Sequence, residues 1–251
     1  MTSTLGIGVL ITGASSGIGA ALAVAYAAPG VRLALSGRDA GRLEDVAARC
    51  RAAGADVACR VLCVTDAAAM ADWVAEAEPL DMVIANAGIS AGTGGGAESA
   101  DQTRAIFAVN VDGVLNTVLP AVEGMRARRR GQIGIVASVA GFRGLPSAPA
   151  YCASKAAVKV WGEGLRGWLA NDGVGVSVIL PGFVESRITA ANRFHMPLLM
   201  PGDRAARIIR RGLDRNVGRI GFPWPTVFVG WLMCVLPNAV VDRMTRRLPG
   251  K

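Results

Sequence analysis

The sequence predicts one α/β domain, in which helices cover both faces of a parallel β-sheet, a doubly wound arrangement. Short apolar runs alternate with amphipathic runs as far as about position 222, which is the pattern of repeated βαβ units. Hydrophobic residues make up 52% of the 251 residues, enough for a sheet that is buried on both faces. A glycine-rich segment directly after the first apolar run points to the same class.

The apolar runs and the stretches between them predict the elements in order. We expect strands near 6–11, 31–36, 57–63, 81–85, 131–137, 174–180 and 218–222. We expect helices near 17–28, 40–53, 67–77, 99–127, 152–170 and 203–214. Right-handed crossovers would bring the loops at the carboxyl ends of the strands to one edge of the sheet. The main domain is therefore placed at 1–221, followed by an apolar and basic C-terminal segment at 222–251.

The glycine-rich turn opens the first predicted helix and reads Thr12-Gly13-Ala14-Ser15-Ser16-Gly17-Ile18-Gly19. Backbone N–H groups at a helix start, together with the helix dipole, favour a pyrophosphate at such a turn. Gly13 would allow the tight turn, Gly17 the close approach of the backbone to phosphate, and Gly19 close packing of helix on strand. We therefore expect Gly13 and residues 15–19 to bind a dinucleotide, the alternative being a turn without a ligand.

A second motif pairs a phenol with an ammonium group. Tyr151 and Lys155 stand four residues apart, so a helix would place them on one face. A neighbouring cation favours the ionised phenol, which predicts a lowered pKa for Tyr151 from its ordinary value of about 10. Ser138, at the end of an apolar run, could present a second hydroxyl to the same reacting oxygen. Such a group can transfer a proton near neutral pH.

Together these motifs resemble those of the short-chain dehydrogenase/reductase family over roughly residues 1–186. The spacing T-G-x-x-x-G-x-G is similar to that family's turn and differs from the general fingerprint G-x-G-x-x-G. The resemblance implies a Rossmann-type fold and a catalytic tetrad of Asn110, Ser138, Tyr151 and Lys155. The other positions that it assigns to dinucleotide contact are Cys63, Val64, Asn86, Ala87, Gly88, Pro181, Gly182, Val184 and Ser186.

Two of these positions depart from the family's pattern. Cys63 stands where relatives often carry an aspartate that contacts the adenine amino group, so that contact is expected to be lost. Ser186 stands where threonine is usual, and either hydroxyl can donate a hydrogen bond. By the same resemblance, residues 86–88 would steady the central sheet beside the adenosine, and residues 181–186 would line the nicotinamide.

The choice of cofactor depends on the end of the second predicted strand. An NAD enzyme usually places a carboxylate there to bond the ribose 2′-hydroxyl. In this chain Gly37 takes that place and Arg38 follows, which suits a charge-assisted contact with a 2′-phosphate. We therefore favour NADP(H), with NAD(H) as the alternative. Against this, Arg38 could be a solvated charge beside Asp39, and Ser16 stands where many NADP-preferring relatives carry a basic residue.

The resulting hypothesis is the NADPH-dependent reduction of a ketone to a secondary alcohol. Tyr151 would protonate the developing alkoxide, and Ser138 would stabilise charge on that oxygen. By resemblance, Lys155 would hold the nicotinamide ribose and Asn110 would order a water that relays protons. The alternatives are an NAD-linked alcohol dehydrogenase working in the oxidative direction and a membrane-associated nucleotide-binding protein without turnover. One histidine, His195, and five cysteines without metal spacing predict no metal site.

The C-terminal third carries the positive charge of the chain. Residues 187–251 hold twelve basic against three acidic residues, while the whole chain has a net charge of +8. Residues 220–241 hold no charge but include Trp224, Phe228 and Trp231, with arginines on either side in the sequence. Prolines limit an uninterrupted helix there to about 226–236, too short to cross a bilayer. Residues 222–241 are therefore expected to contact a membrane surface, the alternatives being core packing or a subunit interface.

Residues 187–214 stand where relatives of the family place a mobile substrate lid. Phe194, Met196 and Leu198 make its first part apolar, which favours a lipophilic carbonyl substrate. By resemblance, the helix near 152–170 would form the interface of a homodimer or homotetramer. No signal peptide precedes the first strand, so we expect a cytoplasmic protein, with peripheral contact at the inner membrane face. Nucleic acid is not expected as a partner, because the positive charge is interleaved with apolar residues.

Overall fold

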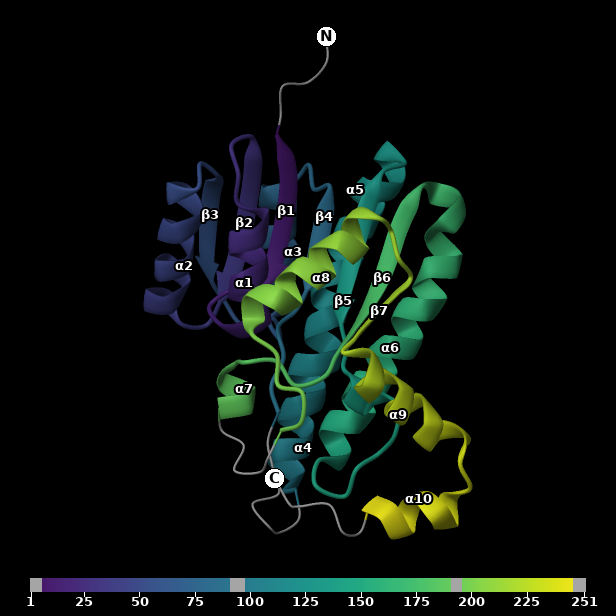
Figure 1. Ribbon diagram of the computed structural model, residues 1–251. Coiled ribbons are helices and arrows are strands. Elements are labelled where there is room, and N and C mark those ends of the chain that lie inside the picture. Colours follow the sequence, from purple (N-terminus) through teal and green to yellow (C-terminus); the bar gives the residue numbers. More distant parts are fainter. Residues whose placement is uncertain (1–5, 91–97, 191–195, 246–251) are drawn as a thin grey trace.

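A seven-stranded parallel sheet forms the centre of the molecule, with the strand order β3-β2-β1-β4-β5-β6-β7 (Figure 1). The computed structural model describes residues 6–90, 98–190 and 196–245. The strands are β1 (Ile7–Thr12), β2 (Val31–Gly37), β3 (Asp56–Val61), β4 (Met82–Ala85), β5 (Gly131–Val136), β6 (Val174–Pro181) and β7 (Arg219–Phe222). Each lies within two residues of its predicted bounds. The order reverses between β1 and β4, and a crevice forms beyond the carboxyl ends of strands at such a point.

Helices cover the two faces of this sheet in separate layers, which confirms the doubly wound Rossmann-type fold. One layer holds α1 (Gly17–Tyr26), α2 (Ala40–Ala52) and α8 (Gly202–Asp214), and the other holds α3 (Ala67–Ala77), α5 (Gly113–Arg128) and α6 (Pro149–Leu169). Side chains of β1 alternate between the layers, because Val9 and Ile11 pack with the first and Leu10 with the second. All three are fully buried, which explains why the strands read as continuous apolar runs.

The long helix expected at 99–127 is interrupted in the structure. It consists of α4 (Ala100–Phe107), a π-helical turn (Ala108–Asp112) and α5. The stretch Ala100–Arg128 is long and apolar enough to cross a membrane by length and composition alone. The buried residues Val114 and Val118 belong to the core that α5 shares with the sheet, so this stretch is a core element of the fold.

Three helices beyond β6 lie at the carboxyl edge of the sheet: α7 (Arg187–Ala190), α9 (Trp224–Val235) and α10 (Asn238–Thr245). Helix α9 begins two residues before its predicted start, because Pro225 stands in the first turn, where a missing N–H costs nothing. Short 3-10 turns occur at Val139–Gly141 and Ala170–Asp172.

The arginines that precede the apolar C-terminal segment in sequence do not flank it in space. Helix α8 runs back along the sheet, and there Arg210 donates a hydrogen bond to the carbonyl of Ala25 on α1. Arg219 opens β7 at the amino edge and pairs with Glu163 on α6 at 2.6 Å. These arginines are therefore separated from α9 by strand β7, which runs from the amino edge to the carboxyl edge of the sheet.

Candidate active site

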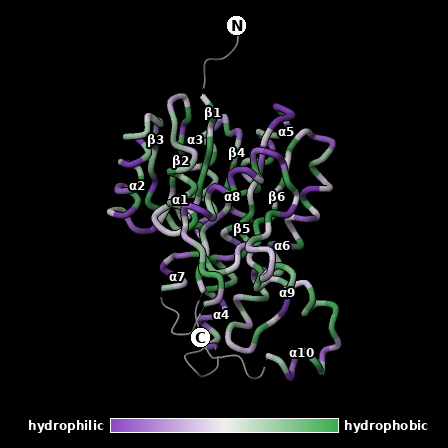
Figure 2. Tube along the Cα trace, viewed as in Figure 1, coloured by the Kyte–Doolittle hydropathy of each residue, from purple (hydrophilic) through white to green (hydrophobic). Residues whose placement is uncertain are grey.

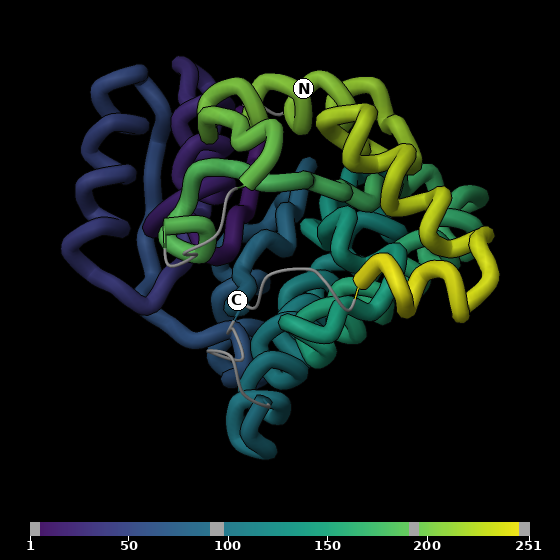
Figure 3. Tube along the Cα trace, turned by 60° about the horizontal axis from the view of Figure 1, so that its bottom comes forward, coloured from purple at the N-terminus to yellow at the C-terminus, as the bar shows by residue number. Residues whose placement is uncertain are grey.

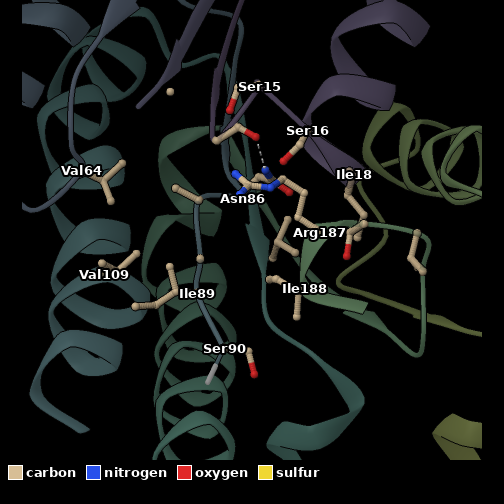
Figure 4. A pocket seen from close by; sticks show the side chains of 18 of the residues that line it. Ser15, Ser16, Ile18, Val64, Asn86, Ile89, Ser90, Val109, Arg187 and Ile188 are labelled. Carbon is tan, nitrogen blue, oxygen red and sulfur yellow. Dashed lines mark hydrogen bonds between the residues drawn. The ribbon is translucent and has the colours of Figure 1, made fainter. Parts of the chain in front are cut away.

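A cavity of about 710 Å³ opens at the carboxyl edge of the sheet, beside the ends of β1, β2, β4, β5 and β6. Every residue expected to contact a dinucleotide or to carry catalysis lines it, except Gly19 and Asn110. In Figure 4, Val64, Ile89 and Val109 stand on one side of the hollow, across from Ser15, Ser16 and Ile18. The sheet topology thus brings together residues that lie far apart in the sequence.

The glycine-rich turn has the shape that its sequence predicts. Gly13 and Gly17 have φ of +65° and +56°, a region that only glycine adopts without strain. Gly19 lies behind the turn, where a Cβ atom would come within 2.4 Å of the Gly13 carbonyl oxygen. Ser16 directly precedes α1, and its hydroxyl makes no capping hydrogen bond to the helix. The first N–H groups of α1 consequently remain available to a ligand in the cavity.

Asn86 fixes this turn to the end of β4. Its side-chain amide donates hydrogen bonds to the carbonyls of Thr12 at 2.9 Å and Gly13 at 3.2 Å. The Thr12 hydroxyl in turn accepts from the backbone N–H groups of Asn86 at 3.1 Å and Ala87 at 3.2 Å. These four bonds hold β1 and β4 together at the point where the strand order reverses, so the floor of the cavity is rigid.

Two arginines and a serine stand at the end of the cavity beside β2. Arg38 is exposed, and Arg42 pairs with Asp39 at 2.7 Å one turn into α2. Among the described residues, Nε of Arg42 and Oγ of Ser36 are buried polar atoms without a hydrogen-bond partner. Because buried polar groups are rarely left unpaired, these atoms indicate a polar ligand in this part of the cavity. Ser36 and Arg42 were not among the predicted site residues, although Arg42 follows Arg38 at helical spacing.

Cys63 lies at the same end of the cavity, and its Sγ is 3.1 Å from Oγ1 of Thr65. Burial raises the pKa of this thiol, but hydrogen bonds from Thr65 and the positive charge of Arg38 outweigh that effect and lower it. Arg38 therefore lies close enough to Cys63 for its positive charge to favour the thiolate form.

At the opposite end of the cavity, the hydroxyl groups of Ser138 and Tyr151 lie together. The Ser138 hydroxyl hydrogen-bonds Tyr151, accepts from the N–H of Ala140 at 3.1 Å and lies 3.5 Å from the Pro181 carbonyl. Burial raises the pKa of Tyr151, and the bond from Ser138 offsets this only in part. The expected lowering of the Tyr151 pKa by Lys155 is therefore wrong for this structure, because desolvation of the phenol is the larger effect.

Lys155 lies behind the tyrosine and is 4% exposed. Its ammonium group donates a hydrogen bond to the Val136 carbonyl at 2.8 Å and stands 6.0 Å from the centre of the Tyr151 ring. Burial lowers the pKa of Lys155 to about 8. Helix α6 thus carries Tyr151 and Lys155 on one face, as their spacing predicts. The ammonium group of Lys155 lies beside the aromatic ring of Tyr151.

Asn110 does not line the cavity but holds one of its walls. Its side-chain amide accepts from the N–H of Ile89 at 2.8 Å and donates to the Ile89 carbonyl at 2.9 Å. The same amide donates to the Ser154 hydroxyl at 3.0 Å, which donates to the Tyr151 carbonyl at 2.8 Å. The π-helical turn aims Asn110 at these partners, so this residue connects the loop after β4 with α6.

Several residues outside the predicted site also reach the cavity. Ile89 and Val109 enter from the β4 loop and the π-helical turn, and Arg187 and Ile188 enter from α7 (Figure 4). Ser186 caps α7, since its hydroxyl accepts from the N–H of Thr189 at 3.2 Å. These positions carry no motif, and only the path of the chain after β4 and β6 brings them to the cavity. Phe194, named for the lid, and the single histidine His195 lie outside the described residues.

The fold and this cavity define an oxidoreductase of the Rossmann type. More specifically, residues 8–196 match the family model described as short chain dehydrogenase, so the chain belongs to that family.

Relatives of similar length agree with this assignment. An "uncharacterized oxidoreductase" of Myxococcus xanthus is 40% identical over 243 residues, covering 95% of this chain and 96% of the relative. Another of Mycobacterium tuberculosis (strain ATCC 25618 / H37Rv) is 34% identical over 247 residues, with the same two shares.

Solved structures resemble the whole chain. A short-chain dehydrogenase from Sphingobium yanoikuyae in complex with NADPH is 27% identical, with a TM-score of 0.81 over 96% of each chain. A short-chain dehydrogenase/reductase from Burkholderia phymatum in complex with NAD is also 27% identical, with a TM-score of 0.83 over 100% of this chain and 99% of that one.

Proposed function

We propose that the protein uses NADPH to reduce the carbonyl group of a lipophilic ketone, with Tyr151 as the proton donor. The observation that carries this proposal is the hydrogen-bonded pair of Ser138 and Tyr151 at the inner end of the cavity, with Lys155 behind it. The glycine turn and the unpaired atoms of Ser36 and Arg42 fit the phosphates and ribose of a dinucleotide along the same cavity. When bound, NADPH supplies the hydride.

The protonation state of the site favours the reductive direction. A raised pKa keeps Tyr151 protonated at neutral pH, which is the form that can donate a proton to a developing alkoxide. Ser138 donates a hydrogen bond to the same oxygen and stabilises the charge that forms there. Lys155, with a pKa of about 8, is mainly protonated at pH 7 and stabilises the negative charge left on the phenol. Asn110 keeps the loop of Ile89 in place beside them.

The preference for NADPH over NADH rests on Arg38 together with Arg42. A charge-assisted hydrogen bond contributes about 1.5–3 kcal/mol, or roughly a 10- to 100-fold difference in affinity. We expect Arg38→Ala and Arg42→Ala each to weaken NADPH binding by about tenfold or more and NADH binding by less than about twofold. Arg49→Ala, on the exposed side of α2, is the matched control.

Fluorescence titration of the three variants with both nucleotides measures this preference. Equal affinity of the wild type for NADH and NADPH, unchanged by either cavity variant, would exclude the 2′-phosphate contact. It would instead favour the NAD-linked alcohol dehydrogenase as the second candidate.

A lipophilic substrate is supported by the apolar side chains around the inner end of the cavity. Ile89, Val184 and Ile188 line it, and Leu198 and Leu199 of the following segment are 54% and 42% exposed. We assign 1–221 to the catalytic domain and 222–251 to an accessory segment. The substrate lid expected at 187–214 is limited to 187–201, because α8 packs against α1 and the sheet as part of the core. The protein is further proposed to be cytoplasmic and to form a homodimer or homotetramer.

The deciding experiment measures NADPH oxidation over a series of ketones of increasing chain length, with wild type and Tyr151→Phe side by side. We expect kcat/KM to rise with chain length and turnover to fall by at least about 100-fold in the variant. NADPH affinity measured on both proteins is the control for an intact cavity. Faster turnover of short polar ketones would disprove the lipophilic substrate, and binding of NADPH without turnover of any ketone would disprove the reductase.

A further inference from the structure

Helix α9 exposes a narrow apolar stripe. Trp224, Phe228, Trp231 and Val235 follow the spacing i, i+4, i+7 and i+11, which places them on one face of the helix. They are 76%, 50%, 49% and 59% exposed, and the rings of Phe228 and Trp231 lie 5.9 Å apart. Exposed apolar clusters of this kind mark interaction sites in folded proteins.

The opposite face of α9 is attached to the body of the protein, so the stripe cannot turn inward. Gly230 is buried against the Phe142 ring, and the thiol of Cys234 donates a hydrogen bond to the Phe142 carbonyl at 2.8 Å. Near its start, Thr226 stands next to Gly182. The exposure of the stripe is therefore a property of the folded chain.

Helix α10 continues this apolar area. Val240 and Met244, at i and i+4, are 45% and 55% exposed. Arg143 bonds Asn238 at 3.0 Å and pairs with Asp242 at 3.5 Å, which fixes α10 and neutralises its carboxylate. We call Trp224, Phe228, Trp231, Val235, Val240 and Met244 the C-terminal surface. Figure 2 shows that the chain is mostly hydrophobic along α9.

We propose that the C-terminal surface docks α9 and α10 into the boundary of an anionic lipid bilayer. Tryptophan and phenylalanine beside positive charge are the composition of interfacial helices. The charge is on the same part of the chain: Arg243 is exposed on α10, and Arg246, Arg247 and Lys251 follow in the sequence. With 12 residues, α9 is about 18 Å long, so it would lie in the plane of the membrane and not cross it.

The positive charge near the C-terminal surface favours a bilayer over a second copy of this chain as the partner that covers this surface. In a symmetric dimer each copy contributes the same surface, so the contact would bring together two surfaces of like charge, each with Arg243 exposed. Anionic headgroups complement that charge, at about 1 kcal/mol for each basic residue near the surface.

The C-terminal surface lies beside the end of the cavity that holds Ser138 and Tyr151. What this position means for substrate entry rests on the proposed function. Strand β7 leads into α9, and the N–H of Gly182 donates a hydrogen bond to the Phe222 carbonyl at 2.7 Å. Helix α9 also packs on the turn Val139–Gly141, which begins directly after Ser138. In Figure 3, α9 and α10 lie on the opposite side of the carboxyl edge from α2. A docked protein would therefore hold the proposed catalytic end of the cavity close to the lipid, from which a lipophilic ketone could enter.

Vesicle sedimentation tests the proposal with the full-length protein. Wild type, Trp224→Ser/Trp231→Ser and Trp168→Ser are mixed with vesicles of phosphatidylcholine alone or with about 30% phosphatidylglycerol. Trp168 is a matched control, because it is 60% exposed on α6, away from the C-terminal surface. We expect wild type and Trp168→Ser to bind the anionic vesicles alike, and the double variant to bind at least about tenfold more weakly. Circular dichroism verifies that all three are folded.

Two results would overturn the proposal. One is equal sedimentation of the double variant and the wild type, including the case in which neither binds. The other is a loss of self-association in the double variant without any vesicle binding by the wild type, which would assign the surface to a contact between copies.

Vesicle sedimentation does not depend on catalysis, so the membrane-docking proposal and the proposed function can each be refuted without the other. We expect Tyr151→Phe to bind vesicles like the wild type. Vesicle binding without turnover of any ketone would refute the proposed function and leave the docking surface intact.

Discussion

Lys155 and Tyr151 show how burial, more than sequence spacing, sets the chemistry of single residues in this site. Their spacing correctly predicts one helix face, and both lie on α6. Burial nevertheless raises the pKa of Tyr151 and lowers the pKa of Lys155 to about 8. The degree of desolvation depends on β5, α6 and the turn after β5 packing together, which no local pattern in the sequence reports.

The lowered pKa of Lys155 predicts that this residue destabilises the fold. In the unfolded chain the lysine titrates near its ordinary value of 10.5, and in the folded chain at about 8. The cost of burying its charge is therefore fully present below pH 8 and disappears as pH rises toward 10.5. We expect Lys155→Met to be more stable than the wild type at pH 7 by roughly 1–3 kcal/mol, with a smaller difference at pH 9.5.

Chemical denaturation of both proteins at the two pH values measures this difference. Other titrating groups are common to both proteins and cancel to a first approximation. If Lys155→Met is less stable than the wild type at pH 7, burial of the Lys155 charge does not destabilise the fold. The same holds if the difference in unfolding free energy between the two proteins does not change with pH.

At the scale of elements, the sequence predicts seven strands and most helices, because each has its own hydrophobic period and end signals. It misses the π-helical turn Ala108–Asp112, since the apolar pattern of the predicted helix continues through it. That turn exists because Asn110 finds partners in Ile89 and Ser154, which belong to other elements. The α9 helix, in contrast, follows from prolines at its two ends.

Close packing of α6 on the sheet depends on a single glycine. A Cβ atom on Gly162 would lie 2.7 Å from Cγ2 of Val178 on β6, whereas a Cβ atom on Gly164 would meet nothing within 4 Å. We expect Gly162→Ala to destabilise the protein by about 1–3 kcal/mol through overpacking. Gly164→Ala, in the same helix, should stabilise it by about 0.5–1 kcal/mol. Thermal unfolding of the two variants gives the comparison, and the same sign for both would refute the packing role of Gly162.

At the scale of the whole molecule, two groups of exposed apolar residues stand out in the part of the chain that the structure describes. One is the C-terminal surface, and the other is formed by α5 and α6, where Leu119, Val160 and Trp168 are 49%, 62% and 60% exposed. The guanidinium group of Arg126 on α5 lies 5.6 Å from the Trp168 ring, so the two helices meet at this side chain. An exposed apolar face of this kind supports the proposed homo-oligomer.

We expect Trp168→Glu to shift the protein to a smaller sedimenting species, because the contact would bury an unpaired carboxylate in each subunit. Sedimentation velocity at matched concentrations makes the measurement. Trp224→Ser is the control, since its side chain belongs to the C-terminal surface and its loss should leave the oligomer unchanged. An oligomer that persists in the first variant and dissociates in the control would reverse the assignment of the two surfaces.

The sequence by itself determined the fold class, the order of the elements, the glycine turn and the pairing of Tyr151 with Lys155. These features are local, since they depend on hydrophobic period, on helical spacing and on the conformations open to glycine. Only the tertiary structure decided that Ser36 and Arg42 face the cavity, that Asn110 supports its wall and that the arginines of α8 lie away from α9. Those features depend on which elements pack together, and the free energy of that packing is shared among residues distant in sequence.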